Sequence, residues 1–154
     1  MYQDFVVPNT PITFAQLRFD LFLGNRATAF FTPSPPTLDF GVAAFNQQAR
    51  VDLLRAGTDP FSVAAADVLQ NLYQTKPGDP LVSGYATTLA DVTSVLAANT
   101  GKTLRLRFAE TDNVSTFQLG VDNVSLNAVP EPSSLTSAGL GALLLGLALY
   151  RRQR

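Results

Sequence analysis

The chain has 154 residues and a formal net charge of −1, and it contains neither cysteine nor histidine. Without cysteine it forms no disulfide and no thiolate metal site; without histidine it lacks the usual general base and the Ser-His-Asp arrangement. No basic patch occurs before the C-terminal residues, which excludes nucleic-acid binding. The roughly 128 residues before the C-terminal segment are enough for one domain with its own core.

Short alternating runs, separated by proline, glycine and asparagine, dominate residues 1–128. The clearest is 14–23, where Leu17, Phe19 and Leu21 alternate with side chains of the opposite face, as in a strand with one buried face. The run 64–73 fits a helix nearly as well as a strand, and we favour the strand. The predicted strands lie at 3–7, 14–23, 28–31, 38–40, 48–56, 64–73, 85–88, 103–109 and 117–126, the last with a bend at Gly120.

One short helical turn is predicted over 91–98. Asp91 can cap it, Val92, Val95 and Leu96 share one face, and Gly101 lies in the segment that stops it. Many short strands with turn signals between them and no internal repeat predict an all-β fold, an antiparallel β-sandwich of the jelly-roll kind, over residues 1–128.

The C-terminal segment 129–154 has a different composition. Pro130, Glu131 and Pro132 are followed by an uncharged, mostly apolar run, and the basic residues Arg151, Arg152 and Arg154 end the chain. The two prolines predict a stiff, extended, solvated motif. The apolar run predicts a transmembrane helix over 134–151, because at about 1.5 Å per residue it nearly spans a ~30 Å hydrocarbon core and the arginines can snorkel. Those arginines stay cytoplasmic, which places residues 1–128 outside.

This three-part tail resembles the PEP-CTERM sorting signal of Gram-negative bacteria. The resemblance implies that the tail enters the inner membrane, that an exosortase cuts it near Pro130-Glu131-Pro132, and that the rest of the protein reaches the cell envelope or the extracellular matrix. The mature protein is then expected to end between Val129 and Ser133. A membrane anchor that is never processed and an amphipathic core helix are the alternatives.

The preceding domain is similar to the jelly-roll domains that often precede such tails and to galactose-binding-like carbohydrate-binding modules. The segments that carry the similarity are 3–8 with 17–23, 101–108 and 120–126. In those domains a further strand usually precedes a segment like 3–7, and an exported protein needs a signal peptide. The sequence shows neither this strand nor a signal peptide, so we expect that its N-terminal start is incomplete. A missing first strand would leave a sheet edge open near the closing strand.

Four residues are candidates for a Ca²⁺ site: Asp122, Glu110, Asp112 and Asn113. Their oxygen ligands suit Ca²⁺ if they converge. In the resembling modules the aspartate of the closing strand can bind a structural Ca²⁺, which implies this role for Asp122 alone. Solvated turn carboxylates are the alternative, and no other cofactor is expected.

No catalytic residue is assigned. A paired-carboxylate glycosidase needs two acids across a cleft, and nothing in the sequence places Asp52 beside Glu110. Arg105 and Arg107 alternate with apolar residues and predict a polar sheet face shared with Asp52 or Asp20. This face either forms cross-strand ion pairs or lines a sugar-binding surface.

Tyr73 and Tyr85 are candidates for stacking on a sugar, with core or rim positions as the alternative. We therefore expect an exported, non-enzymatic cell-surface or matrix protein of the kind found in biofilms. Its partners would be an exosortase, the inner membrane and exopolysaccharide. A fragment of a carbohydrate-active enzyme and an unprocessed, membrane-anchored envelope protein are the alternatives.

Overall fold

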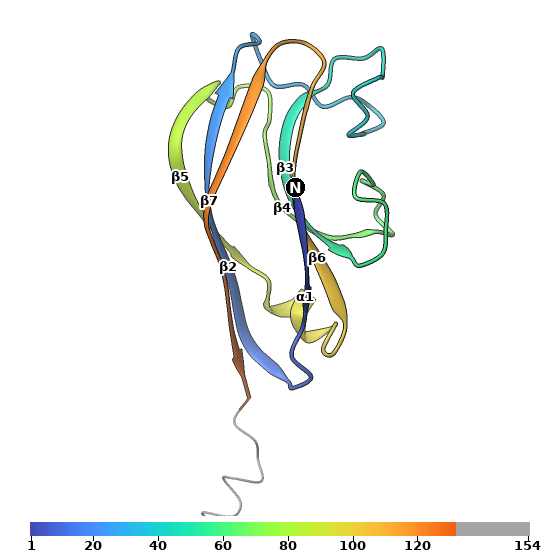
Figure 1. The fold of residues 1–154 in the computed structure, drawn as a ribbon, viewed down its shortest axis with the longest axis vertical. Helices are drawn as coiled ribbons and strands as arrows, with labels where there is room; N and C mark the ends of the chain where they lie inside the picture. The colour runs from blue at the N-terminus through green and yellow to red at the C-terminus, as the bar shows by residue number, and fades with distance from the viewer. Residues whose placement is uncertain (132–154) are drawn as a thin grey trace, which may run out of the picture.

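The computed structural model describes residues 1–131, which form two packed antiparallel sheets (Figure 1). The first sheet has the order β1-β6-β3-β4 and the second the order β5-β2-β7. The elements are β1 (Tyr2–Val6), β2 (Ile12–Asn25), β3 (Gln47–Arg55), β4 (Val68–Gln74), β5 (Val82–Asp91), α1 (Thr93–Ala97), β6 (Thr103–Asp112) and β7 (Phe117–Pro130). The predicted all-β sandwich is confirmed.

The predicted helical turn is present as α1. Asp91 Oδ1 accepts a hydrogen bond from the Thr93 N–H at 2.8 Å, and Leu96 is buried in the core. Within residues 1–131, no helix has the length and apolar character needed to cross a membrane. The helix predicted over 134–151 lies outside the described residues.

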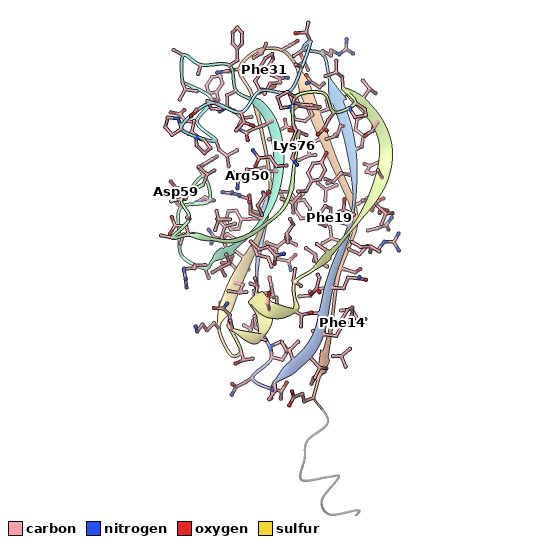
Figure 2. All side chains as sticks on the ribbon, turned by 180° about the vertical axis from the view of Figure 1, so that it is seen from behind. Phe14, Phe19, Phe31, Arg50, Asp59 and Lys76 are labelled. Atoms are coloured by element: carbon pink, nitrogen blue, oxygen red, sulfur yellow. The ribbon has the colours of Figure 1, made fainter. Side chains whose placement is uncertain are left out.

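The core lies between the two sheets. It consists of the inward-facing apolar residues, which alternate with outward-facing residues along the strands. Phe19 from β2 is fully buried and meets Phe108 from β6 edge to face, with ring centroids 5.6 Å apart. Figure 2 shows Phe19 directed into the space between the layers. The remaining fully buried apolar side chains include Ala15 of β2, Val51 and Leu53 of β3, Leu96 of α1 and Leu104 of β6.

Two predicted strands, 28–31 and 38–40, are absent from the described structure. Phe31 forms only an isolated bridge with Gln47. In the loop that follows, the Asn46 side chain donates to the carbonyl oxygens of Thr37 and Asp39, both at 3.0 Å. A side chain thus satisfies backbone groups that a neighbouring strand would otherwise bind.

The remaining strand predictions are confirmed with shifted boundaries. The ambiguous run 64–73 is a turn followed by β4, because the Val68 N–H bonds back to the Ala64 carbonyl at 3.0 Å. The strands β5 and β7 are both longer than predicted. The ladder between β2 and β7 is irregular between Arg18 and Asp20, where Asn123 of β7 has a φ of 51°, whereas Gly120 stays in register opposite Phe22.

The contact between Phe19 and Phe108 yields a stability prediction. Replacing Phe19 with alanine should lower the free energy of unfolding by about 3–5 kcal/mol, because it empties a fully buried site that joins both sheets. Urea denaturation measures this loss. The matched control is Phe40→Ala, which removes a ring that is 70% exposed and should change the value by less than about 0.5 kcal/mol. A loss below about 1 kcal/mol for Phe19→Ala would contradict the packing.

Candidate functional site

The first residues of the Pro130-Glu131-Pro132 motif are held by the sandwich. Pro130 is the register partner of Ile12, and the Glu131 N–H donates to the Pro11 carbonyl at 2.8 Å. Because β7 is an edge strand, a proline without an N–H is tolerated at this position. Pro130 and Glu131 are exposed and extended, as the prolines predict. Pro132 and the basic residues Arg151, Arg152 and Arg154 lie outside the described residues.

A buried carboxylate organises the outer face of the four-stranded sheet. Asp52 has no exposed surface, and its two oxygens accept hydrogen bonds from Arg50 Nη2 at 2.6 Å and Arg107 Nη2 at 2.5 Å. Arg50 Nε at 2.7 Å and Asn71 Nδ2 at 2.8 Å donate two further hydrogen bonds to the same carboxylate. The network joins β3, β4 and β6 on the face opposite the core. It confirms the predicted pairing of Arg107 with Asp52; Asp20 lies on the other sheet.

The two arginines of β6 also hold a loop over this face. Arg107 Nη1 donates to the carbonyls of Pro60 and Ser62, both at 2.7 Å, and Arg105 Nη1 donates to the Thr58 carbonyl at 3.1 Å. Figure 1 shows the loop 56–67 projecting outside this layer. Arg105 also pairs with Asp4 at 2.7 Å. These donors therefore face protein atoms, not an open sugar-binding surface.

The Asp52 network yields a pH-dependent stability. Burial by itself would raise the pKa of Asp52, but the hydrogen bonds from Arg50, Asn71 and Arg107 outweigh it and hold the pKa below its ordinary value of 3.8. Because the folded pKa lies below the unfolded one, ionised Asp52 stabilises the fold above about pH 4. This contribution is lost as the pH falls through the folded pKa.

Replacing Asp52 with asparagine should lower the free energy of unfolding at pH 7 by about 3–5 kcal/mol, because two buried guanidinium groups lose their counter-charge. The difference from the parent protein should begin to shrink below about pH 4 and continue to shrink as the pH falls through the lowered pKa of folded Asp52, where the parent loses the same charge. Urea denaturation across pH 3–7 measures it, with Asp59→Asn in the exposed loop as the control. A difference that is the same at both ends of this range would contradict the network.

The calcium candidates do not converge. Asp122 lies on β7 of the three-stranded sheet, whereas Glu110 and Asp112 end β6 of the four-stranded sheet. Asn113 uses its side chain to hold the preceding loop, donating to the Val42 and Ala44 carbonyls and accepting the Asn46 N–H. Residues 1–131 contain no group of three or more His, Cys, Asp or Glu side chains that could hold a metal ion.

The two acids considered for glycosidase chemistry face opposite sides of their sheet. Asp52 points to the outer face with Arg107, whereas Glu110 shares the strand face of Phe108, two residues earlier, whose ring lies in the core. Partial burial raises the pKa of Glu110, while hydrogen bonds lower that of Asp52. The structure thus brings no second carboxylate to Asp52 across a cleft.

An aromatic pair, of exposed Tyr85 and half-buried Phe22, lies on the outer face of the three-stranded sheet. The rings of Phe22 and Tyr85 are 5.9 Å apart, and Tyr85 is 59% exposed. Gly120 lies opposite Phe22, and a Cβ at Gly120 would come within 2.7 Å of the Tyr85 hydroxyl oxygen. Gly120 therefore allows the Tyr85 side chain to extend over the sheet as far as β7. We call Phe22, Tyr85 and Gly120 the aromatic platform.

Polar groups adjoin the aromatic platform on the same sheet. Asp20 accepts hydrogen bonds from Thr87 Oγ1 at 2.6 Å and from Asn123 Nδ2 at 2.7 Å, and these two bonds lower the pKa of Asp20. Arg18 lies 3.7 Å from the same carboxylate and is half exposed. A buried, ionised carboxylate thus holds a hydroxyl, an amide and a guanidinium in place beside the aromatic platform.

Of the two tyrosines proposed for stacking, only Tyr85 is available. Tyr73 packs against the core, and burial raises its pKa. Sequence reasoning missed Phe22 and Gly120 as parts of this surface. The missing information was the register between β2 and β7, which is set by pairing between segments about 100 residues apart.

Comparison with known proteins identifies the C-terminal segment. Residues 128–153 match the PEP-CTERM protein-sorting motif. No curated protein and no solved structure matches the chain. The molecule is thus a β-sandwich followed by a sorting signal. That signal is the PEP-CTERM motif, which implies processing by an exosortase and export to the cell surface.

Replacing Pro130, Glu131 and Pro132 together with alanine should leave full-length protein in the inner membrane of a host that carries an exosortase, because the recognised motif is lost. Membrane fractionation with an antibody against the sandwich measures the retained fraction. The matched control, Pro77→Ala with Pro80→Ala, removes two exposed prolines from the loop between β4 and β5 and should be processed like the parent. Normal processing of the triple variant would contradict recognition of the motif.

Proposed function

We propose that this exosortase-sorted protein is a non-enzymatic cell-surface or matrix component that binds polysaccharide through the aromatic platform. The observation that carries the proposal is the placement of Tyr85 over Gly120, which builds an exposed ring surface on the outer face of the three-stranded sheet. The sorting motif accounts for delivery to the surface, and the platform supplies a contact there.

The chemistry of the platform suits a sugar chain. Aromatic rings present a flat apolar face, against which the C–H face of a pyranose can pack. The hydroxyl groups at the edge of the sugar then require hydrogen-bonding partners, and charged partners give the stronger bonds. Exposed Asn123 and Arg18, both held by buried Asp20, supply these groups beside the rings.

The shape of the surface favours a polymer over a small ligand. The hollow beside Arg18 and Asn123 has a volume of about 390 Å³ and opens widely to solvent. A small-molecule site normally encloses most of its ligand. An open face that combines rings and polar groups instead allows a long chain to pass across the sheet.

The positions of Asp52 and Glu110, the two carboxylates considered for glycosidase chemistry, support a protein without catalytic activity. Asp52 is enclosed by two arginines, and Glu110 lies on the other side of the sheet. A glycosidase requires two carboxyl groups on either side of one glycosidic bond, separated by about 5–9.5 Å. This arrangement favours a binding protein over a fragment of a carbohydrate-active enzyme.

Replacing Tyr85 with alanine should weaken binding to exopolysaccharide about tenfold or more, because it removes the exposed ring while leaving the fold intact. Affinity electrophoresis in gels that contain exopolysaccharide purified from the host measures this change. Tyr2→Ala, which removes an exposed tyrosine from the other sheet, is the matched control and should migrate like the parent. Equal retardation of Tyr85→Ala and the parent would overturn the platform as the binding surface.

A further inference from the structure

The end of the sandwich that holds the start of the sorting motif carries an exposed apolar pair. Phe14 of β2 and Val129 of β7 are register partners, and their side chains are 42% and 45% exposed. Both lie on the outer face of the three-stranded sheet, because the neighbouring Ala15 is fully buried in the core. Figure 2 labels Phe14 near the end of β7. We call Phe14 and Val129 the end pair.

The segments around the end pair carry no charge. Residues 5–17 and 123–130 contain no Asp, Glu, Lys or Arg. They form the turn from β1 to β2 and the last part of the ladder between β2 and β7, which Figure 1 shows at the same end of the molecule. Moving a charged group out of water is costly. These segments can therefore approach a lipid surface without removing a charge of their own from water.

Backbone groups at the end of β7 are bonded to protein atoms. Thr13 Oγ1 donates to the Val129 carbonyl at 3.1 Å, and the Glu131 N–H donates to the Pro11 carbonyl at 2.8 Å. Pro130 between them has no N–H. Backbone groups without a partner are costly where lipid replaces water. The Val129 carbonyl and the Glu131 N–H do not depend on water for a partner.

The sequence beyond Glu131 limits how far this end can lie from a membrane. Leu135, the first residue of the uncharged apolar run, follows Glu131 by four residues. At no more than about 3.6 Å per residue, Glu131 then lies within about 14 Å of the hydrocarbon when the run is inserted as predicted. The headgroup region on each side of a bilayer is about 5–8 Å thick. The end pair is thus tethered within reach of the lipid surface.

We propose that the end pair contacts the lipid surface of the inner membrane while the sorting tail is inserted, and that this contact holds the Pro130-Glu131-Pro132 motif where an exosortase in that membrane reaches it. The proposal rests on the predicted insertion of the tail. It is independent of polysaccharide binding, because the aromatic platform lies eight residues further along β2, which is about 25 Å at about 3.4 Å per residue.

The contact acts only while the tail is attached. Membrane affinity scales with the apolar area that is buried, and the end pair offers two partly exposed side chains. The tether raises the effective concentration of the lipid surface, so that a weak contact becomes populated. Once the tail is cut off, the end pair alone does not retain the sandwich, and the protein leaves the membrane.

The test uses a single tryptophan as a probe, because the chain contains none of its own. Full-length Phe14→Trp is reconstituted into phosphatidylcholine vesicles whose acyl chains are brominated near the headgroups, since bromine quenches tryptophan fluorescence only at close range. The matched control is Tyr85→Trp, an exposed position on the same face. Quenching of Phe14→Trp should be at least about threefold stronger, because the control lies about 25 Å further from the tail.

A third probe, Leu143→Trp in the apolar run, reports insertion of the tail separately. Quenching of Leu143→Trp without quenching of Phe14→Trp would overturn the lipid contact itself. An unquenched Leu143→Trp would overturn the predicted insertion on which the contact rests. Equal quenching of Phe14→Trp and Tyr85→Trp would also contradict the proposal, because the whole sheet face would then lie on the membrane. A blue shift of Phe14→Trp emission without quenching would assign this end to a second copy of the chain.

A second arm measures processing in a host that carries an exosortase. Phe14→Ser should slow removal of the tail severalfold in a pulse-chase experiment, whereas Phe14→Trp, which keeps a large apolar ring, should be processed like the parent. Phe40→Ser, in the loop between β2 and β3, is the matched control for loss of an exposed ring. Urea denaturation checks that each variant is folded. Equal processing of folded Phe14→Ser and the parent would overturn the positioning role.

Discussion

The long antiparallel ladder between β2 and β7 is the constraint on which the rest of this molecule depends. It runs from the pair Asn25 and Phe117 to the pair Ile12 and Pro130. Its register places Gly120 opposite Phe22, which gives the Tyr85 side chain room to extend over the sheet. The same ladder leaves one edge of β7 free and brings the first residues of the sorting motif onto the sandwich.

The two outer faces of the sandwich have different roles because they satisfy their polar groups in different ways. On the four-stranded sheet, Asp52 is surrounded by donors and the arginines hold the loop 56–67, so the face is closed. On the three-stranded sheet, Asp20 is satisfied by Thr87 and Asn123 on the sheet itself, and no described loop carbonyl binds its arginine neighbour. The second face therefore presents its aromatic residues to solvent.

The position of the sorting motif follows from the same pairing. Because the Glu131 N–H bonds to the Pro11 carbonyl, a cut just beyond Glu131 would leave the ladder of residues 1–131 intact. The released sandwich would then keep its core and its aromatic platform. Export and folding are compatible in this arrangement because the signal begins where the last strand ends.

Much of the fold could be predicted from local patterns. The alternation around Phe19 and around Leu106 identifies β2 and β6, and Asp91 marks the helical turn. The false strand at 38–40 arose because its short apolar pattern gives no sign that the Asn46 side chain satisfies the loop carbonyls.

The candidate sites were harder to predict, because they depend on register and on which face of a sheet a loop covers. The pairing of Arg107 with Asp52 was among the predicted alternatives, since both residues lie on the polar side of an alternating strand. The role of Gly120 was not predicted. A glycine in a strand also indicates a bend, and only the pairing with β2 shows that it accommodates a tyrosine from β5.

The most direct test of this account is the intact mass of the protein recovered from the surface of a host that carries an exosortase. The account predicts a single form whose C-terminus lies between Val129 and Ser133, with the sandwich intact. Surface protein that still ends at Arg154 would contradict sorting through this motif.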